Sequence, residues 1–192
     1  MRPESCALVI LASGLSERFG DADKLMADFR GKPLVQHVID AAADIPFTER
    51  FAVIPKLSEQ RRKLFNYKGY SLIENTHPEL GQGSSLRLAA SAVHAKGYEA
   101  ICVMLGDMPF VQKEDVINLL QNLSDKDRAI SCCNKTLLPP AIFKNGALDE
   151  LTKIELKSGA KALFKSDNFY KHVLPEYAAR DIDTPETLAR LS

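Results

Sequence analysis

The chain has 192 residues, of which 45% are hydrophobic and 26% charged, with 25 Lys and Arg against 25 Asp and Glu. This length suits a single domain with a sizeable core. A net charge of zero argues against nucleic acid or an anionic membrane as the main partner, because both select a basic surface. No apolar run approaches the roughly 20 residues that a membrane span requires.

The apolar start of the chain is interpreted as the first strand of the fold. MRPESCALVILASG has no separate apolar region followed by a cleavage site, so it is unlike a signal peptide. The four cysteines include a vicinal pair but no CxxC spacing. A reduced, cytoplasmic protein without a zinc site is therefore expected.

Apolar, β-branched segments alternate with amphipathic ones over most of the chain. The expected strands are Ala7–Leu11, Arg50–Ile54, Ser71–Glu74, Ala100–Leu105 and Ala129–Cys132. The expected helices are Pro33–Ala43, Ser58–Phe65, Ser84–Ala95 (capped by Ser84 or Ser85) and Lys113–Leu120. This alternation predicts an α/β fold with a doubly wound, mostly parallel sheet that has helices on both faces.

The last third of the chain is less regular. Leu138-Pro139-Pro140 is expected to interrupt any central strand over Lys135–Asn145. Phe164–Leu174 mixes turn and strand signals. A final helix is expected with Thr184 as its N-cap and Pro185 at the first helical position.

The most informative segment is LASGLSERFGDADKL, from Leu11 to Leu25. It leaves a strand, breaks into small residues at Ser13 and Gly14, and places Arg18 and Lys24 just beyond. Small residues let a ligand approach the backbone, and two fixed cations suit a polyphosphate. The chain has neither GxGxxG nor GxxxxGK[ST], so a phosphate loop of another type is predicted. The alternative is an ordinary strand-to-helix turn with solvated charges.

Asp107 follows an apolar strand in LGDMP and stands at the carboxyl edge of the expected sheet. Such a carboxylate can hold Mg²⁺, or it can serve as a turn residue. Asp181 and Asp183 share one side of an extended segment, with Ile182 pointing inward. Asp183 is a candidate second metal ligand or a carboxylate at a helix start.

Gly81–Arg87, the segment GQGSSLR, offers backbone N–H groups and the hydroxyls of Ser84 and Ser85 at a helix N-terminus. A phosphate, ribose or base can be held there, although a well-capped helix is the simpler explanation of the segment alone. No GxSxG elbow or other nucleophile signature is present, so covalent catalysis is not favoured.

Taken in order, LASGLSERFGDADKL, GKPL, GQGSSLR, LGDMPFV and DIDTPETL resemble the MobA/MocA-like nucleotidyltransferase family over nearly the whole chain. The similarity is greatest to the molybdenum cofactor cytidylyltransferase branch. The resemblance implies a Rossmann-like, three-layer α/β/α fold of the nucleotide-diphospho-sugar transferase type. It also implies one domain, 1–192, with a nucleotide-binding half (1–110) and an acceptor-binding half (111–192). The implied reaction transfers a nucleotidyl group from a nucleoside triphosphate to an acceptor phosphate, with Mg²⁺ and release of pyrophosphate.

The same resemblance assigns roles to individual residues. The implied nucleotide-binding residues are Leu11, Ala12, Ser13, Gly14, Arg18, Lys24, Ser84 and Ser85. The implied catalytic residues are Arg18 on the β- and γ-phosphates, Lys24 near the α-phosphate, and Asp107. The implied Mg²⁺ ligands are Asp107 and Asp183.

Two departures from the family pattern bear on the substrates. The signature reads LASG, where cytidylyl enzymes have LAAG and guanylyl enzymes LAGG; because Ser13 is larger than Gly, a pyrimidine and hence CTP is favoured. On the acceptor side, Leu138-Pro139-Pro140 and Lys157–Ala160 stand where members carry Gly-His-Pro and Gly-Asp-x-Gly-Ala. The nucleotide half therefore matches the pattern more closely than the acceptor half.

The favoured acceptor is the phosphate of a molybdopterin-type cofactor. The alternatives are a guanylyltransferase of the same pathway, a transferase acting on a sugar or alditol phosphate, and a cofactor carrier that docks on a molybdoenzyme through Leu137–Phe143. An NAD-binding oxidoreductase is disfavoured, because the glycine fingerprint is missing.

Overall fold

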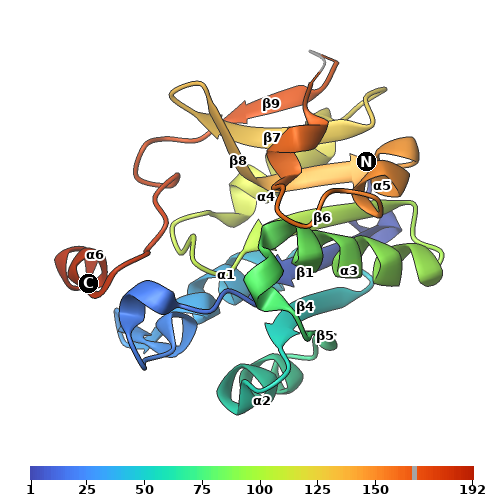
Figure 1. Cartoon of the computed structure of the whole chain (residues 1–192). Helices are drawn as coiled ribbons and strands as arrows, with labels where there is room; N and C mark the ends of the chain where they lie inside the picture. Colours follow the sequence, from blue (N-terminus) through green and yellow to red (C-terminus); the bar gives the residue numbers. More distant parts are fainter. Residues whose placement is uncertain (166–167) are drawn as a thin grey trace.

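A computed structural model describes residues 1–165 and 168–192. Its centre is a seven-stranded sheet with the strand order β5-β4-β1-β6-β8-β7-β9 (Figure 1). The strands are β1 (Cys6–Leu11), β4 (Arg50–Pro55), β5 (Ser71–Asn75), β6 (Ala100–Leu105), β7 (Arg128–Cys133), β8 (Thr136–Lys144) and β9 (Tyr170–Val173). Strands β5, β4, β1 and β6 are parallel, whereas β8 runs antiparallel to both of its neighbours. A separate ribbon pairs β2 (Asp28–Phe29) with β3 (Lys32–Pro33).

Helices cover both faces of the sheet. The helices are α1 (Leu34–Ala43), α2 (Glu59–Tyr67), α3 (Gln82–Ala95), α4 (Lys113–Asn122) and α5 (Gly146–Leu151). A further helix, α6 (Pro185–Leu191), lies beside the carboxyl edge of the sheet, at the left of Figure 1. Helices α3 and α5 lie on the near face in Figure 1 and α1 and α4 on the far one. Among the described helices, none is long and apolar enough to cross a membrane.

The alternation of side chains along β1 explains why its sequence is apolar without a break. Leu8 and Ile10 pack in the core beneath α1 and α4, while Ala7 and Val9 pack beneath α3 and α5. A parallel strand that is buried on both faces has no polar side. The three-layer α/β/α fold predicted from the sequence is therefore confirmed.

The prediction that Leu138-Pro139-Pro140 interrupts a central strand was wrong. Strand β8 runs through these residues and lies between β6 and β7. The ladder to β7 is irregular there: Ile130 pairs with Ala141 but Ser131 pairs with Leu138. The pairing with β6 ends at Ala141. The two prolines thus occupy positions that need no ladder hydrogen bond, which is where a strand tolerates proline.

The helix starts were predicted with mixed success. Thr184 caps α6 as expected, because its Oγ1 accepts a hydrogen bond from the Thr187 N–H at 3.2 Å. Helix α3, by contrast, begins at Gln82 after Gly81, so Ser84 and Ser85 lie in its first turn and are not its cap. Gly81 has a φ of +94°, a conformation that suits glycine.

Within Phe164–Leu174, the mixed signals correspond in part to β9, and residues 166–167 lie outside the described part of the chain. The carboxyl ends of β1, β4, β5 and β6 meet at one edge of the sheet, at the left of Figure 1. Loops follow each of these strands, and the segment before α6 returns to the same edge, where the backbone N–H of Ile182 donates to the Asp107 carbonyl at 3.1 Å.

Candidate nucleotide-binding site

Four predicted residues meet at the carboxyl edge. The Lys24 Nζ lies 2.8 Å from the Asp107 Oδ2 and 2.9 Å from the Asp183 Oδ1. The Arg18 Nη1 lies 2.8 Å from the other oxygen of Asp183. Asp107 follows β6, whereas Asp183 is brought across by the backbone contact of Ile182. The fold thus assembles two cations and two carboxylates from three distant stretches of sequence.

The charges in this cluster support one another. Burial acts to lower the pKa of Lys24, but the carboxylates of Asp107 and Asp183 outweigh it, so its pKa is raised. Burial acts to raise the pKa of Asp183, but Lys24 and Arg18 outweigh it, so its pKa is lowered. Burial, followed by the charges of Asp183 and Asp107, raises the pKa of Asp181. Both Lys24 and Asp183 are therefore charged at neutral pH.

Asp107 and Asp183 fit a divalent cation. One ammonium nitrogen already lies within 3 Å of an oxygen from each, so both carboxylates face a common positive charge. Mg²⁺ is usually held by one or two carboxylates, with phosphate oxygens and water completing its shell. Among the described residues, no group of three or more His, Cys, Asp or Glu side chains is arranged around a metal position. Further ligands would come from a bound phosphate and from water.

A buried hydroxyl network supports the neighbouring wall. The Ser13 Oγ lies 2.6 Å from the Ser85 Oγ. The Asn75 amide donates to the Ser84 Oγ at 2.9 Å and to the Ser85 Oγ at 3.0 Å. All four side chains are buried. The network ties the loop after β1 to the end of β5 and the start of α3, so Ser13 and Ser85 come together while Ser84 stands behind them.

Three adjoining pockets cross this edge. The first, of about 250 Å³, lies over Ser16–Arg18 and reaches Lys24, Pro78 and Asp183. The second, of about 210 Å³, shares Pro78 with the first. It is lined by Leu11, Ser13, Gly14, Pro78, Gly81, Gln82, Ser85, Leu105 and Asp107. The third, of about 480 Å³, shares Gln82 and Leu105 with the second. Lys24 and Asp107 therefore stand beside the first two pockets.

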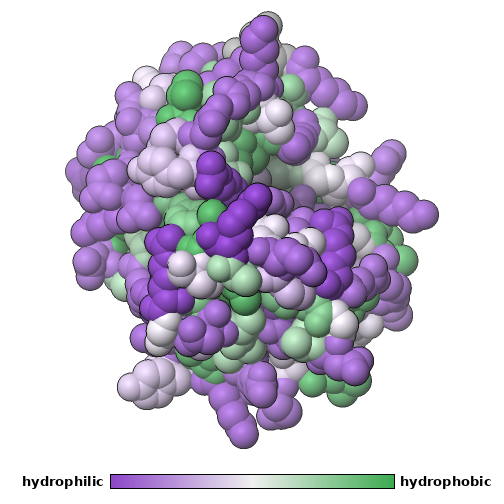
Figure 2. Space-filling view, turned by 90° about the vertical axis from the view of Figure 1, so that its left-hand side faces the viewer, coloured by the Kyte–Doolittle hydropathy of each residue, from purple (hydrophilic) through white to green (hydrophobic). Residues whose placement is uncertain are grey.

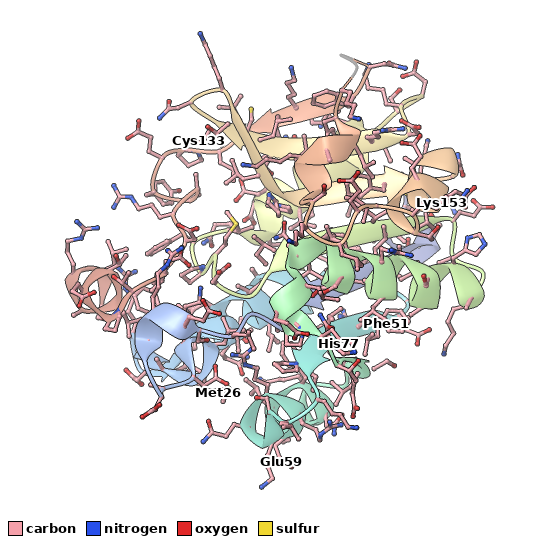
Figure 3. The ribbon with its side chains drawn as sticks, in the orientation of Figure 1. Met26, Phe51, Glu59, His77, Cys133 and Lys153 are labelled. Carbon is pink, nitrogen blue, oxygen red and sulfur yellow. The ribbon has the colours of Figure 1, made fainter. Side chains whose placement is uncertain are left out.

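The figures place this edge within the molecule. Figure 2 looks onto this side, where hydrophilic side chains surround patches of hydrophobic surface. Three labelled residues of Figure 3 lie around the same edge. Met26 is on the turn beside Lys24, His77 is in the loop before α3, and Cys133 is at the end of β7. Lys153 lies at the opposite end of the sheet.

The structure also separates residues that the sequence analysis had grouped. Leu11, Ser13, Gly14 and Ser85 line the second pocket as expected. Ala12 is only 1% exposed, its N–H donates to the Val53 carbonyl, and its own carbonyl accepts from Arg61. Ala12 thus lies behind the pocket wall.

Four residues near the site were missed by sequence reasoning. They are Asp23, Arg61, Asn75 and Gln82. The sequence signal for the burial of Arg61 was its position four residues before Phe65, on the buried face of α2, but nothing in the sequence marked its role. Asn75 carried a weaker signal, since it directly ends a strand at the carboxyl edge.

The family model of the MobA-like NTP transferase domain matches residues 8–173 of this chain. The chain belongs to the MobA-like NTP transferase family. Its members are nucleotidyltransferases. Arg18, Lys24 and Asp107 lie inside the matched region, whereas Asp183 lies beyond it.

Individual MobA-like relatives agree with this membership. A protein of Aquifex aeolicus (strain VF5) described as a probable molybdenum cofactor guanylyltransferase is 26% identical over 187 residues, which cover 95% of this chain and 88% of the relative. The bifunctional protein GlmU of Bordetella petrii is 28% identical over 116 residues, which cover 59% of this chain. The match covers only about a quarter of the length of that protein.

Solved structures share the fold. Rv0371c of Mycobacterium tuberculosis H37Rv superposes with a TM-score of 0.80 at 21% identity, covering 97% of both chains, and another structure of it is a complex with manganese. Molybdopterin-guanine dinucleotide biosynthesis protein A of Archaeoglobus fulgidus gives a TM-score of 0.71 at 21% identity, covering 96% of both chains. The nucleotide-diphospho-sugar transferase type of fold is thus confirmed.

Proposed function

We propose that this MobA-like protein transfers a nucleoside monophosphate from a nucleoside triphosphate to the phosphate of a molybdopterin-type cofactor and releases pyrophosphate. The observation that carries the proposal is the placement of Lys24 and Asp107 beside two adjoining pockets at the carboxyl edge of the sheet. The description of the Aquifex relative supports a molybdenum cofactor as acceptor.

The reaction needs positioning and charge stabilisation more than covalent chemistry. An oxygen of the acceptor phosphate forms a bond to the α-phosphorus, while the bond from that phosphorus to the bridging oxygen breaks and pyrophosphate leaves with the electron pair. Lys24 stabilises charge that develops on the α-phosphate, and Arg18 binds the β- and γ-phosphates over the first pocket. Both already form ion pairs with carboxylates in the structure without a nucleotide.

A divalent cation, Mg²⁺ in this proposal, would be held by Asp107 and Asp183 and would neutralise negative charge on the phosphates. The carboxylate oxygens that face Lys24 supply the hard donors that such an ion prefers. The manganese complex of Rv0371c, a protein of the same fold, is consistent with this assignment.

Ser13 supports CTP as the nucleotide. Its buried hydroxyl is held 2.6 Å from Ser85 in a pocket of only about 210 Å³, which favours the smaller pyrimidine ring. GTP is the second candidate, because the Aquifex relative is described as a guanylyltransferase. Both nucleotides are compatible with the cluster around Lys24, because its proposed role concerns the phosphates and not the base.

The third pocket is the proposed acceptor site. With this assignment, residues 1–110 bind the nucleotide and residues 111–192 supply most of the acceptor site. Leu138, Pro139 and Met108 give it an apolar wall, and Lys161 gives it a cation. A flat heterocycle with a phosphate suits that combination. Gln82 and Leu105 border both this pocket and the second, so an acceptor phosphate placed between them comes near Asp107.

Pyrophosphate release tests the proposal. We expect release from CTP with Mg²⁺ only when the molybdopterin acceptor is present. A clear preference for GTP would contradict the choice of base but not the reaction. Absence of release with all four nucleoside triphosphates, combined with capture by a molybdoenzyme, would instead favour a cofactor carrier.

Substitutions at Ser13 test the choice of base separately. Ser13→Gly should increase the use of GTP relative to CTP about tenfold, because it removes the side chain from the pocket wall. Ser13→Ala is the matched control, since it removes the hydroxyl but keeps the Cβ, and it should retain the preference for CTP.

A further inference from the structure

Arg61 of α2 lies directly behind the loop that follows β1 and is only 3% exposed. Its guanidinium has five N–H donors, and each has an acceptor. The Nε and one Nη2 hydrogen bind the two oxygens of Asp23 at 2.8 and 2.7 Å. Nη1 donates to the carbonyls of Ala12 at 2.6 Å and Gly14 at 3.0 Å, and Nη2 also donates to the Ser16 Oγ at 3.3 Å.

Because all five donors are used inside the protein, Arg61 has none left for a nucleotide. Its effect on a ligand must pass through the groups that it holds. In a trans peptide the C=O of one residue and the N–H of the next point in opposite directions. When Arg61 draws the carbonyls of Ala12 and Gly14 to the back, the N–H groups of Ser13 and Leu15 point to the front.

The front of this loop is the side of the first two pockets. Ser13 lines the second pocket and Leu15 lines the first. Within the described part of the chain, neither backbone N–H has a hydrogen-bond acceptor. Two forward-pointing N–H groups without protein partners form a concave donor site of the kind that binds phosphate oxygens.

The same guanidinium also fixes the turn that carries Lys24. Asp23, which Arg61 holds through both oxygens, accepts a hydrogen bond from the Leu25 N–H at 3.0 Å and so caps this turn. The Lys24 N–H donates to the Ser16 Oγ at 3.3 Å, which closes the connection. One buried side chain therefore sets the register between the loop and the Lys24 ammonium.

We propose that Arg61, together with Asp23, is a positioning residue that keeps the Ser13 and Leu15 N–H groups aimed at the phosphates of the bound nucleoside triphosphate. The inference rests on the proposed function for the identity of that ligand. Lysine cannot replace Arg61, because its three donors radiate from one nitrogen and cannot span acceptors on both sides of the fork.

The test compares Arg61→Lys with Arg62→Lys. Arg62 is the neighbouring arginine, and its guanidinium binds Glu74 and the Lys56 carbonyl away from the loop. The dissociation constants of inorganic tripolyphosphate and of CTP, both with Mg²⁺, are measured by calorimetry below the unfolding transition of each variant. We expect Arg61→Lys to weaken both at least tenfold and Arg62→Lys to change neither. A lower melting temperature with unchanged dissociation constants would overturn the proposal.

If Arg61→Lys does not fold, Asp23→Asn is the variant that tests the proposal. It keeps the size of the side chain, leaves the two carbonyl contacts of Arg61 in place, and should weaken tripolyphosphate about threefold to tenfold. Unchanged affinity in this variant would overturn the proposal as well.

Steady-state kinetics separates positioning from general damage. Arg61→Lys should raise the KM for the nucleotide and lower kcat, while the KM for the acceptor stays unchanged; an equal rise in both KM values would contradict the assignment. If the natural protein binds tripolyphosphate but releases no pyrophosphate from any nucleotide, the transfer reaction is wrong and the role of Arg61 stands. If the natural protein does not bind tripolyphosphate, the role of Arg61 is overturned whatever the transfer assay shows.

Discussion

The two ends of the carboxyl edge are built differently. At the nucleotide end, parallel strands deliver polar side chains that already hold one another, as Lys24 does with Asp107 and Ser13 with Ser85. At the acceptor end, the antiparallel strand β8 and its neighbour β7 border a wider pocket of about 480 Å³. The Lys161 ammonium there has no ion pair or hydrogen bond among the described residues.

This difference has a consequence for specificity. Polar groups that are fixed before the ligand arrives stabilise developing charge without reorganisation. A wide pocket with an unpaired, exposed cation can adjust to the shape of its ligand. We therefore expect substitutions at the nucleotide end to lower the rate of transfer or the binding of the nucleotide, and those at the acceptor end to change only the affinity for the acceptor.

The largest effect is expected from Asp107→Asn. The amide that replaces this carboxylate is neutral, so it is a weaker ligand for the proposed divalent cation and no longer forms an ion pair with Lys24; kcat should fall by about 10²- to 10³-fold. The side chain is 24% exposed, so the melting temperature should change little. Pyrophosphate release and thermal unfolding measure the two effects.

Asp40→Asn is the matched control for this charge loss. Asp40 pairs with Lys32 on the exposed side of α1, remote from the site, and its loss should leave kcat unchanged. Near-normal turnover of Asp107→Asn would remove Asp107 from the catalytic machinery.

Gly83→Ala should mainly affect stability. A Cβ at Gly83 would overlap the carbonyl oxygen of Glu155 and lie 2.6 and 2.7 Å from those of Leu156 and Ser158. These are backbone atoms, so the loop that contains Glu155, Leu156 and Ser158 must move, and the free energy of unfolding should fall by about 1–3 kcal/mol. Chemical denaturation measures this change.

Gly14→Ala should do the opposite and affect nucleotide binding without affecting stability. Nothing lies within 4 Å of a Cβ at Gly14, so stability should be unchanged, but the methyl group enters the second pocket and should weaken nucleotide binding. Gly146→Ala, which is equally free of contacts and remote from the pockets, should change neither property. Loss of stability in Gly14→Ala equal to that in Gly83→Ala would contradict the contrast.

The fold was predictable because its central strands have simple local signals. Cys6–Leu11 and Ala100–Leu105 are buried on both faces and therefore apolar throughout. Strand β8 was not predicted, because proline is normally absent from a central strand. The irregular pairing that accommodates Pro139 and Pro140 depends on β6, β7 and β8 together.

The site was predictable to the extent that its residues follow strand ends. Asp107 comes directly after β6, and Lys24 lies in the loop after β1. Arg61 was not predictable in its role, because in sequence it looks like its neighbour Arg62, an arginine of an amphipathic helix. Its partners Ala12, Gly14 and Asp23 lie some 40 to 50 residues earlier in the chain and meet it only in the fold.

At the acceptor end, Lys161→Ala should raise the KM for the acceptor about threefold to tenfold and leave the KM for the nucleotide unchanged. The expected change is small because Lys161 is exposed and water screens its charge. Lys153→Ala, at the opposite end of the sheet in Figure 3, is the control and should have no effect. An equal rise in the nucleotide KM would mean that the two pockets do not act separately.

The smallest perturbation is thiol modification, which distinguishes the buried sheet from the acceptor pocket. Burial raises the pKa of Cys102 to about 12 and that of Cys6 well above its ordinary value. At pH 8 only about one Cys102 thiol in 10⁴ is ionised, and the thiolate is the reactive form. Iodoacetamide should therefore modify the half-exposed Cys132 and Cys133 and spare the other two until the protein unfolds.

Protection by ligands then tests where the acceptor binds. Cys133 lines the third pocket, whereas Cys132, adjacent on β7, points to the opposite face of the strand. The acceptor should slow modification of Cys133 and not of Cys132, and CTP with Mg²⁺ should slow neither; peptide mass spectrometry follows each site. If the nucleotide protects Cys133 as strongly as the acceptor does, the nucleotide reaches the third pocket and the division of the edge into two ends is wrong. If Cys102 reacts as fast as Cys133, the central sheet opens in the native protein, and the rigid support inferred for the nucleotide end is lost.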